Sequence, residues 1–387
     1  MTPIAIKKLI VNKNMKHYNF DEVIEFDRLK EMFGDENLIP LWVADMDFRT
    51  PDFIVEALKK RCEHEIFGYT FGSDEYYESI INWVHYKHNW KIQREWISYI
   101  PGIVKGIAFA IQCFTQKGDK VIIQPPVYHP FRIVPEKMKR EVVYNPLKMV
   151  DGIYEMDFDH LESIIDDECK VLILCNPHNP GGIVWKKETL VRLADICAKH
   201  NILVISDEIH AEMAYPQYTA ASCSVTFMAP SKTFNIAGIV TSYAIVPNDR
   251  IREEFYSFLE AGEFGDGTIF AYTATTAAYT YGAEWLQQMR MYIMENVRFV
   301  EEFMKQHLPK IKVYQPQASF LVWLDCRELK LSQDELVHLF KDKAGLALND
   351  GSIFGPGGEG HMRLNIGCPR SVLDKAMNAL KKAVDKK

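Results

Sequence analysis

Short runs of β-branched residues alternate with helical segments through the middle of this chain. The runs DKVIIQPP, CKVLILCNP, ILVISDE and TSYAIVP have the composition of buried strands. Between two of them, KKETLVRLADICAKHN places apolar side chains every three or four residues, which is the pattern of an amphipathic helix. This alternation, from about residue 100 to residue 250, predicts an α/β domain built on a mostly parallel sheet.

The pattern changes after residue 283, where a long helical segment, EWLQQMRMYIMENVRFVEEFMKQH, begins. Strand-like SFLVWLDC, a glycine-rich loop, MRLNIG and a closing helix that starts at Pro369 follow it. A chain of 387 residues is long enough for two domains. We therefore expect an N-terminal arm that joins the small domain (1–47), a large domain (48–283) and a smaller α+β domain (284–387).

Charge and composition exclude several classes of protein. The net charge of −7 leaves no basic excess to neutralise phosphates, so we expect no nucleic-acid partner. No apolar run approaches the roughly 18 residues that span a bilayer, and the first twenty residues make a poor signal peptide, so we expect no membrane partner and a cytoplasmic location. The cysteines form no C-x-x-C pair, and we predict no metal site.

Polar residues follow several of the predicted strands, where α/β sheets collect their chemistry. Asn179, Asp207 and Tyr128 stand at three such ends, and Lys232 lies in the apolar stretch MAPSKTFNIAG. Each alone has an ordinary explanation: a turn former, a helix cap, a core aromatic residue and a solvated lysine. Their order and spacing favour another interpretation, because each interval suits one crossover or one strand-plus-loop step and can bring the side chains to one edge of the sheet.

A lysine, a carboxylate, an amide and an aromatic face are the groups that pyridoxal phosphate requires. The lysine can form a Schiff base with the cofactor aldehyde, and the carboxylate can keep the pyridine nitrogen protonated. The amide can donate to the ring hydroxyl oxygen, and the aromatic side chain can stack on the ring. We therefore predict pyridoxal 5′-phosphate as the cofactor.

Longer motifs carry a resemblance to a known family. NPHNPGG, SDEIH and PSKTFN, in that order, resemble the fold-type I, aminotransferase-like pyridoxal-phosphate enzymes. PLWVADMDF, FGYT, PPVYHPF, CNPHNPGGIVW and HMRLNIGCPR are similar, more narrowly, to its cystathionine β-lyase (C–S lyase) branch. The resemblance runs from about Phe20 to the C-terminus. It implies a pyridoxal-phosphate-dependent β-elimination on sulfur amino acids such as cystathionine, giving pyruvate, ammonia and a thiol.

The resemblance also implies roles for single residues around the cofactor. Lys232 forms the Schiff base and then takes the Cα proton, Asp207 pairs with the pyridine nitrogen, Asn179 with the ring hydroxyl oxygen, and Tyr128 stacks on the ring. His210 stands where many aminotransferase-like members have a tyrosine, and we include it among the cofactor-binding residues.

Further roles concern the phosphate and the substrate. The resemblance assigns the phosphate to Ser231 and to the backbone near Val104 and Lys105. Tyr69 is implied to reach the phosphate of a neighbouring subunit, which makes the expected active unit a homodimer. The substrate-binding residues are implied to be Arg363, which holds the carboxylate, Trp42 and Ala44.

Two alternatives stay open. The first is an aminotransferase on the same scaffold, although Val240 stands where those enzymes often have an arginine. The second is a regulatory role in which the protein binds a partner protein besides its catalysis. Two other motifs do not indicate a functional site. We predict that IFGPGGEG forms a turn near Arg363 and that HYKH (85–88) is a solvated helix face.

Overall fold

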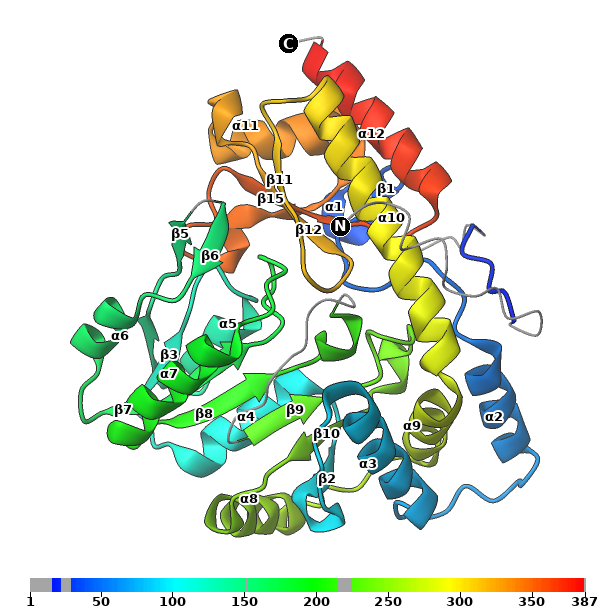
Figure 1. Cartoon of the computed structure of the whole chain (residues 1–387), viewed down its shortest axis with the longest axis vertical. Coiled ribbons are helices and arrows are strands. Elements are labelled where there is room, and N and C mark those ends of the chain that lie inside the picture. Colours follow the sequence, from blue (N-terminus) through cyan, green and yellow to red (C-terminus); the bar gives the residue numbers. More distant parts are fainter. Residues whose placement is uncertain (1–15, 22–28, 151, 215–224, 386–387) are drawn as a thin grey trace.

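Two β-sheets, one above the other in Figure 1, organise the part of the chain that the computed structural model describes. That part comprises residues 16–21, 29–150, 152–214 and 225–385, so that the first fifteen residues of the predicted N-terminal arm lie outside it. No described helix is long and apolar enough to cross a membrane.

The larger sheet has the strand order β2-β10-β9-β8-β7-β3-β4. Its strands are, in chain order, β2 (Ile97–Ile100), β3 (Lys120–Ile123), β4 (Glu141–Tyr144), β7 (Cys169–Cys175), β8 (Leu203–Asp207), β9 (Val225–Met228) and β10 (Ser242–Ile245). The pairs from β4 through β9 are parallel, which confirms the predicted α/β sheet.

Strand β10 departs from this pattern, because it runs antiparallel to both β9 and β2. The connection from β9 to β10 contains only a short 3₁₀ turn, Ala237–Ile239. A parallel neighbour would need a crossover, usually a helix. The chain instead turns straight back, and this return loop carries Lys232.

Helices cover both faces of the larger sheet. On one face α4 (Ile103–Phe114), α5 (Pro130–Lys137) and α8 (Asp249–Ala261) pack against Val121 and Ile123. On the other face α6 (Phe158–Ile164) and α7 (Lys187–Lys199), the predicted amphipathic helix, pack against Ile122. Since neighbouring residues of one strand enter two separate cores, the strands are apolar throughout.

Three further helices stand beside the β2–β10 edge: α2 (Asp52–Cys62), α3 (Asp74–His88) and α9 (Ile269–Tyr281). The expectation for the HYKH segment of α3 is half right: His85 and Tyr86 are exposed, but Lys87 and His88 are half-buried. Burial lowers the pKa of Lys87 to about 8 and that of His88 to about 4. The turn of α3 that carries them therefore packs inward.

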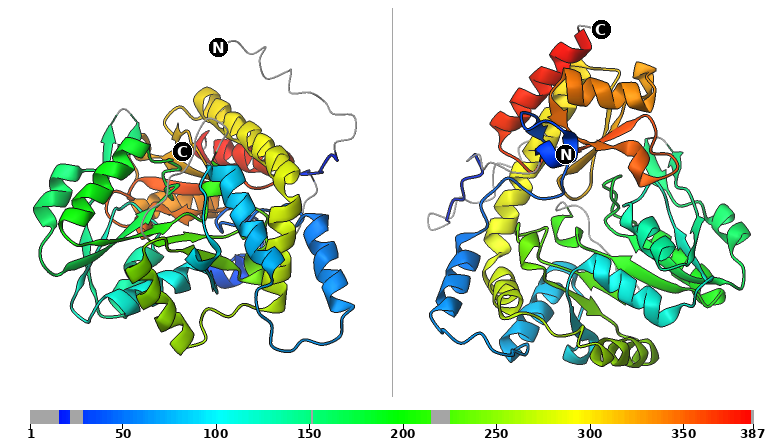
Figure 2. Two further views of the ribbon diagram at one scale, coloured as in Figure 1. Left: turned by 60° about the horizontal axis from the view of Figure 1, so that its bottom comes forward. Right: turned by 180° about the vertical axis from the view of Figure 1, so that it is seen from behind.

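The smaller sheet has the order β11-β12-β15-β14. Its strands are β11 (Lys312–Tyr314), β12 (Leu321–Asp325), β14 (Asn349–Asp350) and β15 (His361–Asn365). The helices around it are α10 (Ala283–His307), α11 (Gln333–His338) and α12 (Arg370–Asp385), whose apolar face, Leu373, Met377 and Leu380, is buried. Helix α10 connects the part of the molecule that contains the larger sheet to the part that contains the smaller sheet, as Figure 2 shows from two sides.

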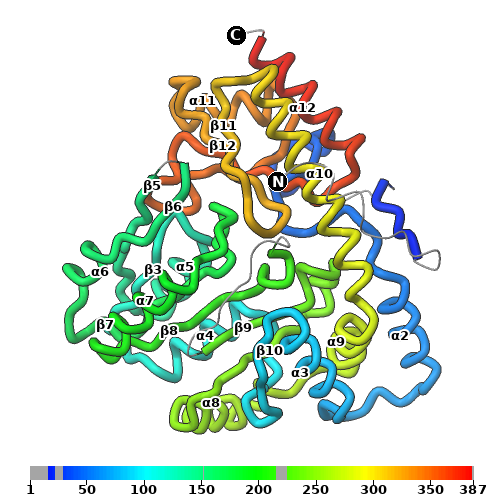
Figure 3. The backbone as a smooth tube through the Cα atoms, in the orientation of Figure 1, coloured from blue at the N-terminus to red at the C-terminus, as the bar shows by residue number. Residues whose placement is uncertain are grey.

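The N-terminal segment returns to the C-terminal part of the chain. After α1 (Leu29–Phe33), β1 (Ile39–Pro40) pairs in parallel with β13 (Leu346–Ala347). From β1 the blue tube in Figure 3 passes between the two sheets before it reaches α2. A separate hairpin, β5 (Lys148–Val150) and β6 (Ile153–Glu155), extends from the larger sheet.

Candidate active site

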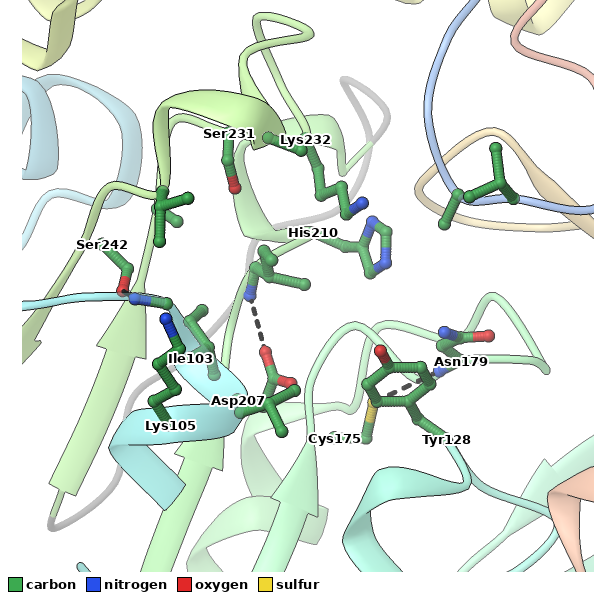
Figure 4. A pocket seen from close by; sticks show the side chains of 18 of the residues that line it. Ile103, Lys105, Tyr128, Cys175, Asn179, Asp207, His210, Ser231, Lys232 and Ser242 are labelled. Carbon is green, nitrogen blue, oxygen red and sulfur yellow. Dashed lines mark hydrogen bonds between the residues drawn. The ribbon is translucent and has the colours of Figure 1, made fainter. Parts of the chain in front are cut away.

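A cavity of about 450 Å³ lies where strands β7 and β8 of the larger sheet end, facing the smaller sheet. Figure 4 shows side chains that line it and labels ten of them. Eleven of the twelve predicted site residues line it: Trp42, Ala44, Val104, Lys105, Tyr128, Asn179, Asp207, His210, Ser231, Lys232 and Arg363. Segments far apart in the sequence therefore meet in one place.

Lys232 projects into the upper part of this cavity from the loop between β9 and β10 (Figure 4). Two backbone hydrogen bonds tighten the loop around it, from Phe234 N to Pro230 O (2.9 Å) and from Ile236 N to Ser231 O (2.9 Å). The side chain is mostly buried, and its Nζ lies 3.0 Å from Asp45 Oδ1. A primary amine is thus held at a fixed position over the cavity.

Asp207 is the last residue of β8, and its carboxyl group is buried in the floor of the cavity. Its Oδ1 accepts a hydrogen bond from Ile209 N at 3.1 Å. Burial raises the pKa of Asp207 to about 6, while the charge of Lys232 and the Ile209 hydrogen bond oppose that shift. Such a buried carboxyl group is stabilised in its charged form by a cation, for example a protonated ring nitrogen.

Polar and aromatic side chains enclose the space above Asp207. Asn179 lies in the loop after β7, where its backbone N donates to Cys175 Sγ at 3.3 Å, and the half-buried ring of Tyr128 stands beside it (Figure 4). His210 is buried, and its Nδ1 lies 3.1 Å from Ser319 Oγ. Burial lowers the pKa of His210 to about 3, so its imidazole is neutral at pH 7.

The first turn of α4 forms the side of the cavity with Lys105 and Ser242 in Figure 4. Gly102, with a φ of 106°, precedes this turn, and no side chain caps the helix. Gly102 N instead donates to Ser242 Oγ at 3.0 Å. The uncapped N–H groups near Val104 and Lys105 are suited to bind an anion such as a phosphate.

Arg363 points into the opposite end of the cavity from the middle of β15. Its guanidinium donates from Nη1 to Asn179 Oδ1 (3.1 Å) and from Nη2 to Trp42 O (2.8 Å) and Asn349 Oδ1 (2.5 Å). No carboxylate lies within salt-bridge distance among the described residues, and Nε has no hydrogen-bond partner there. Burial lowers the pKa of Arg363 to about 10, which leaves it charged at pH 7.

These observations test whether pyridoxal phosphate fits. The cavity offers an amine, a buried carboxyl group with no paired cation in the described part of the chain, and an uncapped helix start. Those are the partners that the aldehyde, the ring nitrogen and the phosphate of the cofactor need. The buried charge of Arg363 lacks an anionic partner, and the α-carboxylate of an amino acid supplies one. The residues present therefore fit the cofactor together with an amino-acid substrate.

Tyr69 is the predicted site residue that does not line the cavity. It lies in the loop between α2 and α3, and its side chain is fully exposed. Sequence reasoning missed three residues of the site, Asp45, Asn349 and Ser242. For Asp45 a signal was present, because VADMDF places two acidic residues inside an otherwise apolar motif.

Known proteins match this chain over most of its length. The sequence model of the aminotransferase class I and II family matches residues 36–380. Over 372 residues the chain is 42% identical to cystathionine beta-lyase PatB of Bacillus subtilis (strain 168), which covers 93% of this chain and 96% of that protein. It is 33% identical to protein MalY of Escherichia coli (strain K12), with 93% and 95% covered.

A solved structure matches nearly the whole chain. The crystal structure of cystalysin from Treponema denticola, which contains pyridoxal 5′-phosphate, has a TM-score of 0.92 and 34% sequence identity to this chain. The match covers 96% of this chain and all of the other. A cofactor-bound protein thus shares the fold of this chain.

Proposed function

The chain belongs to the aminotransferase class I and II family, and on that premise we propose that it is a pyridoxal-phosphate-dependent carbon–sulfur lyase. Its substrates are sulfur amino acids such as cystathionine, and its products are pyruvate, ammonia and a thiol. The observation that carries this function is that Lys232, Asp207 and Arg363 line one cavity, and that Arg363 has no carboxylate partner among the described residues. The cystathionine beta-lyase among the relatives supports elimination as the reaction.

The proposed roles follow from the positions of the side chains. Asp207 holds the ring nitrogen of the cofactor and Asn179 its hydroxyl oxygen, while Tyr128 and His210 enclose the ring. Ser231 and the backbone N–H groups near Val104 and Lys105 hold the phosphate. When bound, the cofactor supplies an aldehyde that links to amines and a protonated ring that accepts the electron pair released at Cα.

The substrate is bound and deprotonated by residues from both sheets. Arg363 binds its α-carboxylate by charge and with Nε, which has no hydrogen-bond partner among the described residues, and Trp42 and Ala44 line the space beside it. Lys232, once displaced from the cofactor, takes the Cα proton at Nζ, after which the thiolate leaves from Cβ. A base held in place in this way can be worth about 7 kcal/mol of the barrier relative to a free amine.

Product identity tests this function. Cofactor-loaded protein is incubated with cystathionine without a keto acid, and pyruvate, ammonia and homocysteine are measured together. We expect all three to rise through many turnovers, and none to rise with Lys232→Ala. A single stoichiometric conversion that turns over only after a keto acid is added would make the protein an aminotransferase instead.

The active unit in this proposal is a homodimer. The loop between α2 and α3 exposes Ile66, Phe67, Tyr69 and Phe71, the last two to 102% and 77%. An apolar loop of this kind is suited to pack on a second copy, where Tyr69 reaches the partner's phosphate site.

Subunit mixing tests the shared site. Tyr69→Ala and Lys232→Ala, each inactive alone, are unfolded and refolded together. If Tyr69 serves the partner, one of the two sites in each mixed dimer is intact, and an equal mixture recovers about a quarter of the wild-type activity. If Tyr69 serves its own subunit, mixing recovers nothing.

The remaining parts of the proposal concern organisation and location. We assign residues 1–47 to an arm and part of the small domain, 48–283 to the large cofactor-binding domain and 284–387 to the small domain. The two separate sheets, within residues 97–245 and 312–365, support this division. The described cysteines are free thiols, which supports a reducing, cytoplasmic location.

A further inference from the structure

Asp45 lies next to the amine of Lys232, although the sequence motifs gave it no role. Its Oδ1 is 3.0 Å from Lys232 Nζ, and about a third of the Asp45 side chain is exposed, against a fifth for Lys232. The contact joins residues 187 positions apart in the sequence. An ion pair in such a partly enclosed site is stronger than one on the open surface.

The backbone on both sides of Asp45 is fixed by two asparagine side chains. Asn365 Nδ2 donates to Val43 O (2.5 Å) and Asp45 O (2.6 Å). Asn235 Oδ1 accepts from Met46 N (3.1 Å), and its Nδ2 donates to Met46 O and Phe48 O (both 2.7 Å). We call residues 43–48 the clasped segment.

The two asparagines belong to the same elements as the main site residues. Asn235 follows Lys232 by three residues in the return loop, and Asn365 follows Arg363 by two in β15. The clasped segment is therefore positioned against the amine and against the carboxylate-binding strand at once. The position of Asp45 relative to Lys232 is thus set by the fold rather than by two mobile surface side chains.

The other charged groups near Lys232 differ from Asp45 in kind. Asp207 lies deeper, on the floor of the cavity, where the proposed function assigns it to the ring nitrogen. His210 is neutral at pH 7, and Arg363 is a cation at the opposite end of the cavity. Asp45 is consequently the carboxylate in direct contact with Nζ.

We propose that Asp45 is a further catalytic residue, which stabilises the ammonium form of Lys232 after that lysine has taken the substrate's Cα proton. In this step the Cα–H bond breaks, its proton moves to Nζ, and its electron pair becomes the Cα=Cβ bond as the Cβ–S pair leaves with sulfur. The Lys232 ammonium then returns the proton to the thiolate, giving the thiol. The inference rests on the proposed lyase function.

The first arm of the test uses the holoenzyme. Asp45→Asn removes the charge and keeps the size, while Asp47→Asn makes the same change two residues away in the clasped segment. We expect Asp45→Asn to lower kcat for thiol release by about 10- to 100-fold, with KM changed by less than about threefold. Asp47→Asn should stay within about threefold of the wild type in both constants.

The second arm uses the cofactor-free protein and needs no turnover. Lys232 is labelled with pyridoxal and borohydride at pH 7.5, and the modified peptide is followed by mass spectrometry. Since the ion pair with Asp45 engages Lys232 Nζ, Asp45→Asn should label about 3- to 10-fold faster than the wild type. Asp45→Glu, which keeps the charge, should label more slowly than Asp45→Asn.

The two arms separate this inference from the proposed function. If the wild type releases no thiol, the lyase function fails, and the catalytic role of Asp45 in elimination falls with it, while the labelling rates still show whether Asp45 controls Lys232. If thiol release proceeds but Asp45→Asn leaves both kcat and the labelling rate unchanged, the inference about Asp45 is overturned and the lyase stands. An unchanged thermal unfolding midpoint for Asp45→Asn shows that the variant is folded.

Discussion

Asn349 and Arg363 lie opposite each other on the neighbouring strands β14 and β15, and Arg363 Nη2 donates to Asn349 Oδ1 at 2.5 Å. The partner is an amide and not a carboxylate, so the hydrogen bond orients the guanidinium and leaves its charge uncompensated. An arginine in this condition binds an incoming carboxylate well, because the protein has already borne the cost of burying it.

Placing a carboxylate at position 349 should therefore weaken substrate binding. In Asn349→Asp the new charge pairs with Arg363 and competes with the substrate, and we expect KM for the amino acid to rise about 10- to 100-fold. Cofactor affinity should not change, since Asn349 has no proposed contact with the cofactor. Steady-state kinetics and cofactor titration check both expectations, and Asn349→Ala, which adds no charge, should raise KM less.

Removing the buried charge of Asp207 should stabilise the cofactor-free protein, although it abolishes activity. The pKa of Asp207 in the folded protein, about 6, lies above its ordinary value of 3.8. Keeping this carboxyl group ionised inside the folded protein therefore costs free energy of folding above about pH 6, and costs none below about pH 4, where the group is protonated in both states. Asp207→Asn should thus raise the free energy of unfolding by about 1–3 kcal/mol at pH 8 and little at pH 4. Denaturant melts at the two pH values measure this, with the exposed Asp195→Asn as control. An equal gain at both pH values would contradict it.

A methyl group at Gly106 should push α4 off the sheet. A Cβ there would lie 2.8 Å from both Ile100 Cγ2 and Phe227 Cε1, two fully buried side chains. We expect Gly106→Ala to lower the free energy of unfolding by about 1–3 kcal/mol, and to weaken cofactor binding because the first turn of α4 moves. Gly238→Ala, where nothing lies within 4 Å, should be close to neutral in the same melts.

Val240 adopts a backbone conformation that suits glycine. Its φ of 57° and ψ of 52° are left-handed, which costs a β-branched residue about 1–3 kcal/mol. Because glycine loses more entropy on folding, we expect Val240→Gly to raise the free energy of unfolding by only about 0.5–1 kcal/mol. The same substitution at the exposed Val191, in the right-handed helix α7, should lower it by a similar amount. Thermal melts that shift in the same direction for both variants would show that Val240 is not strained.

Much of the site could be predicted from the sequence, because parallel strands bring their carboxyl ends to one edge. Asn179 follows β7 and Asp207 ends β8, and these strands are neighbours in the sheet. The strand runs and the long helices were confirmed for the same reason, since their periodicity is local. The antiparallel return of β10 was missed, because the length of the connection that permits it is not a periodic signal.

Contacts between segments that lie far apart in the chain could not be predicted from the sequence. The motif VADMDF marks Asp45 as unusual but does not name Lys232 as its partner, and nothing in the sequence pairs Asn349 with Arg363, because each contact depends on how two separately predicted elements meet. The half-buried Lys87 shows the same limit: a charged segment suggests solvent, and only the packing of α3 places it inside.

The hydrogen bond from Asn365 Nδ2 to Val43 O joins residues that are 322 positions apart, so the newly made chain cannot form it until late in synthesis. At about 5–20 residues per second, a ribosome exposes the N-terminal segment roughly 15–60 seconds before Asn365 exists. Ile39 waits as long for its strand partner Leu346. The return loop that carries Lys232 can form with its sheet much earlier, so the amine of the site is built first and the segment that delivers Asp45 is seated last.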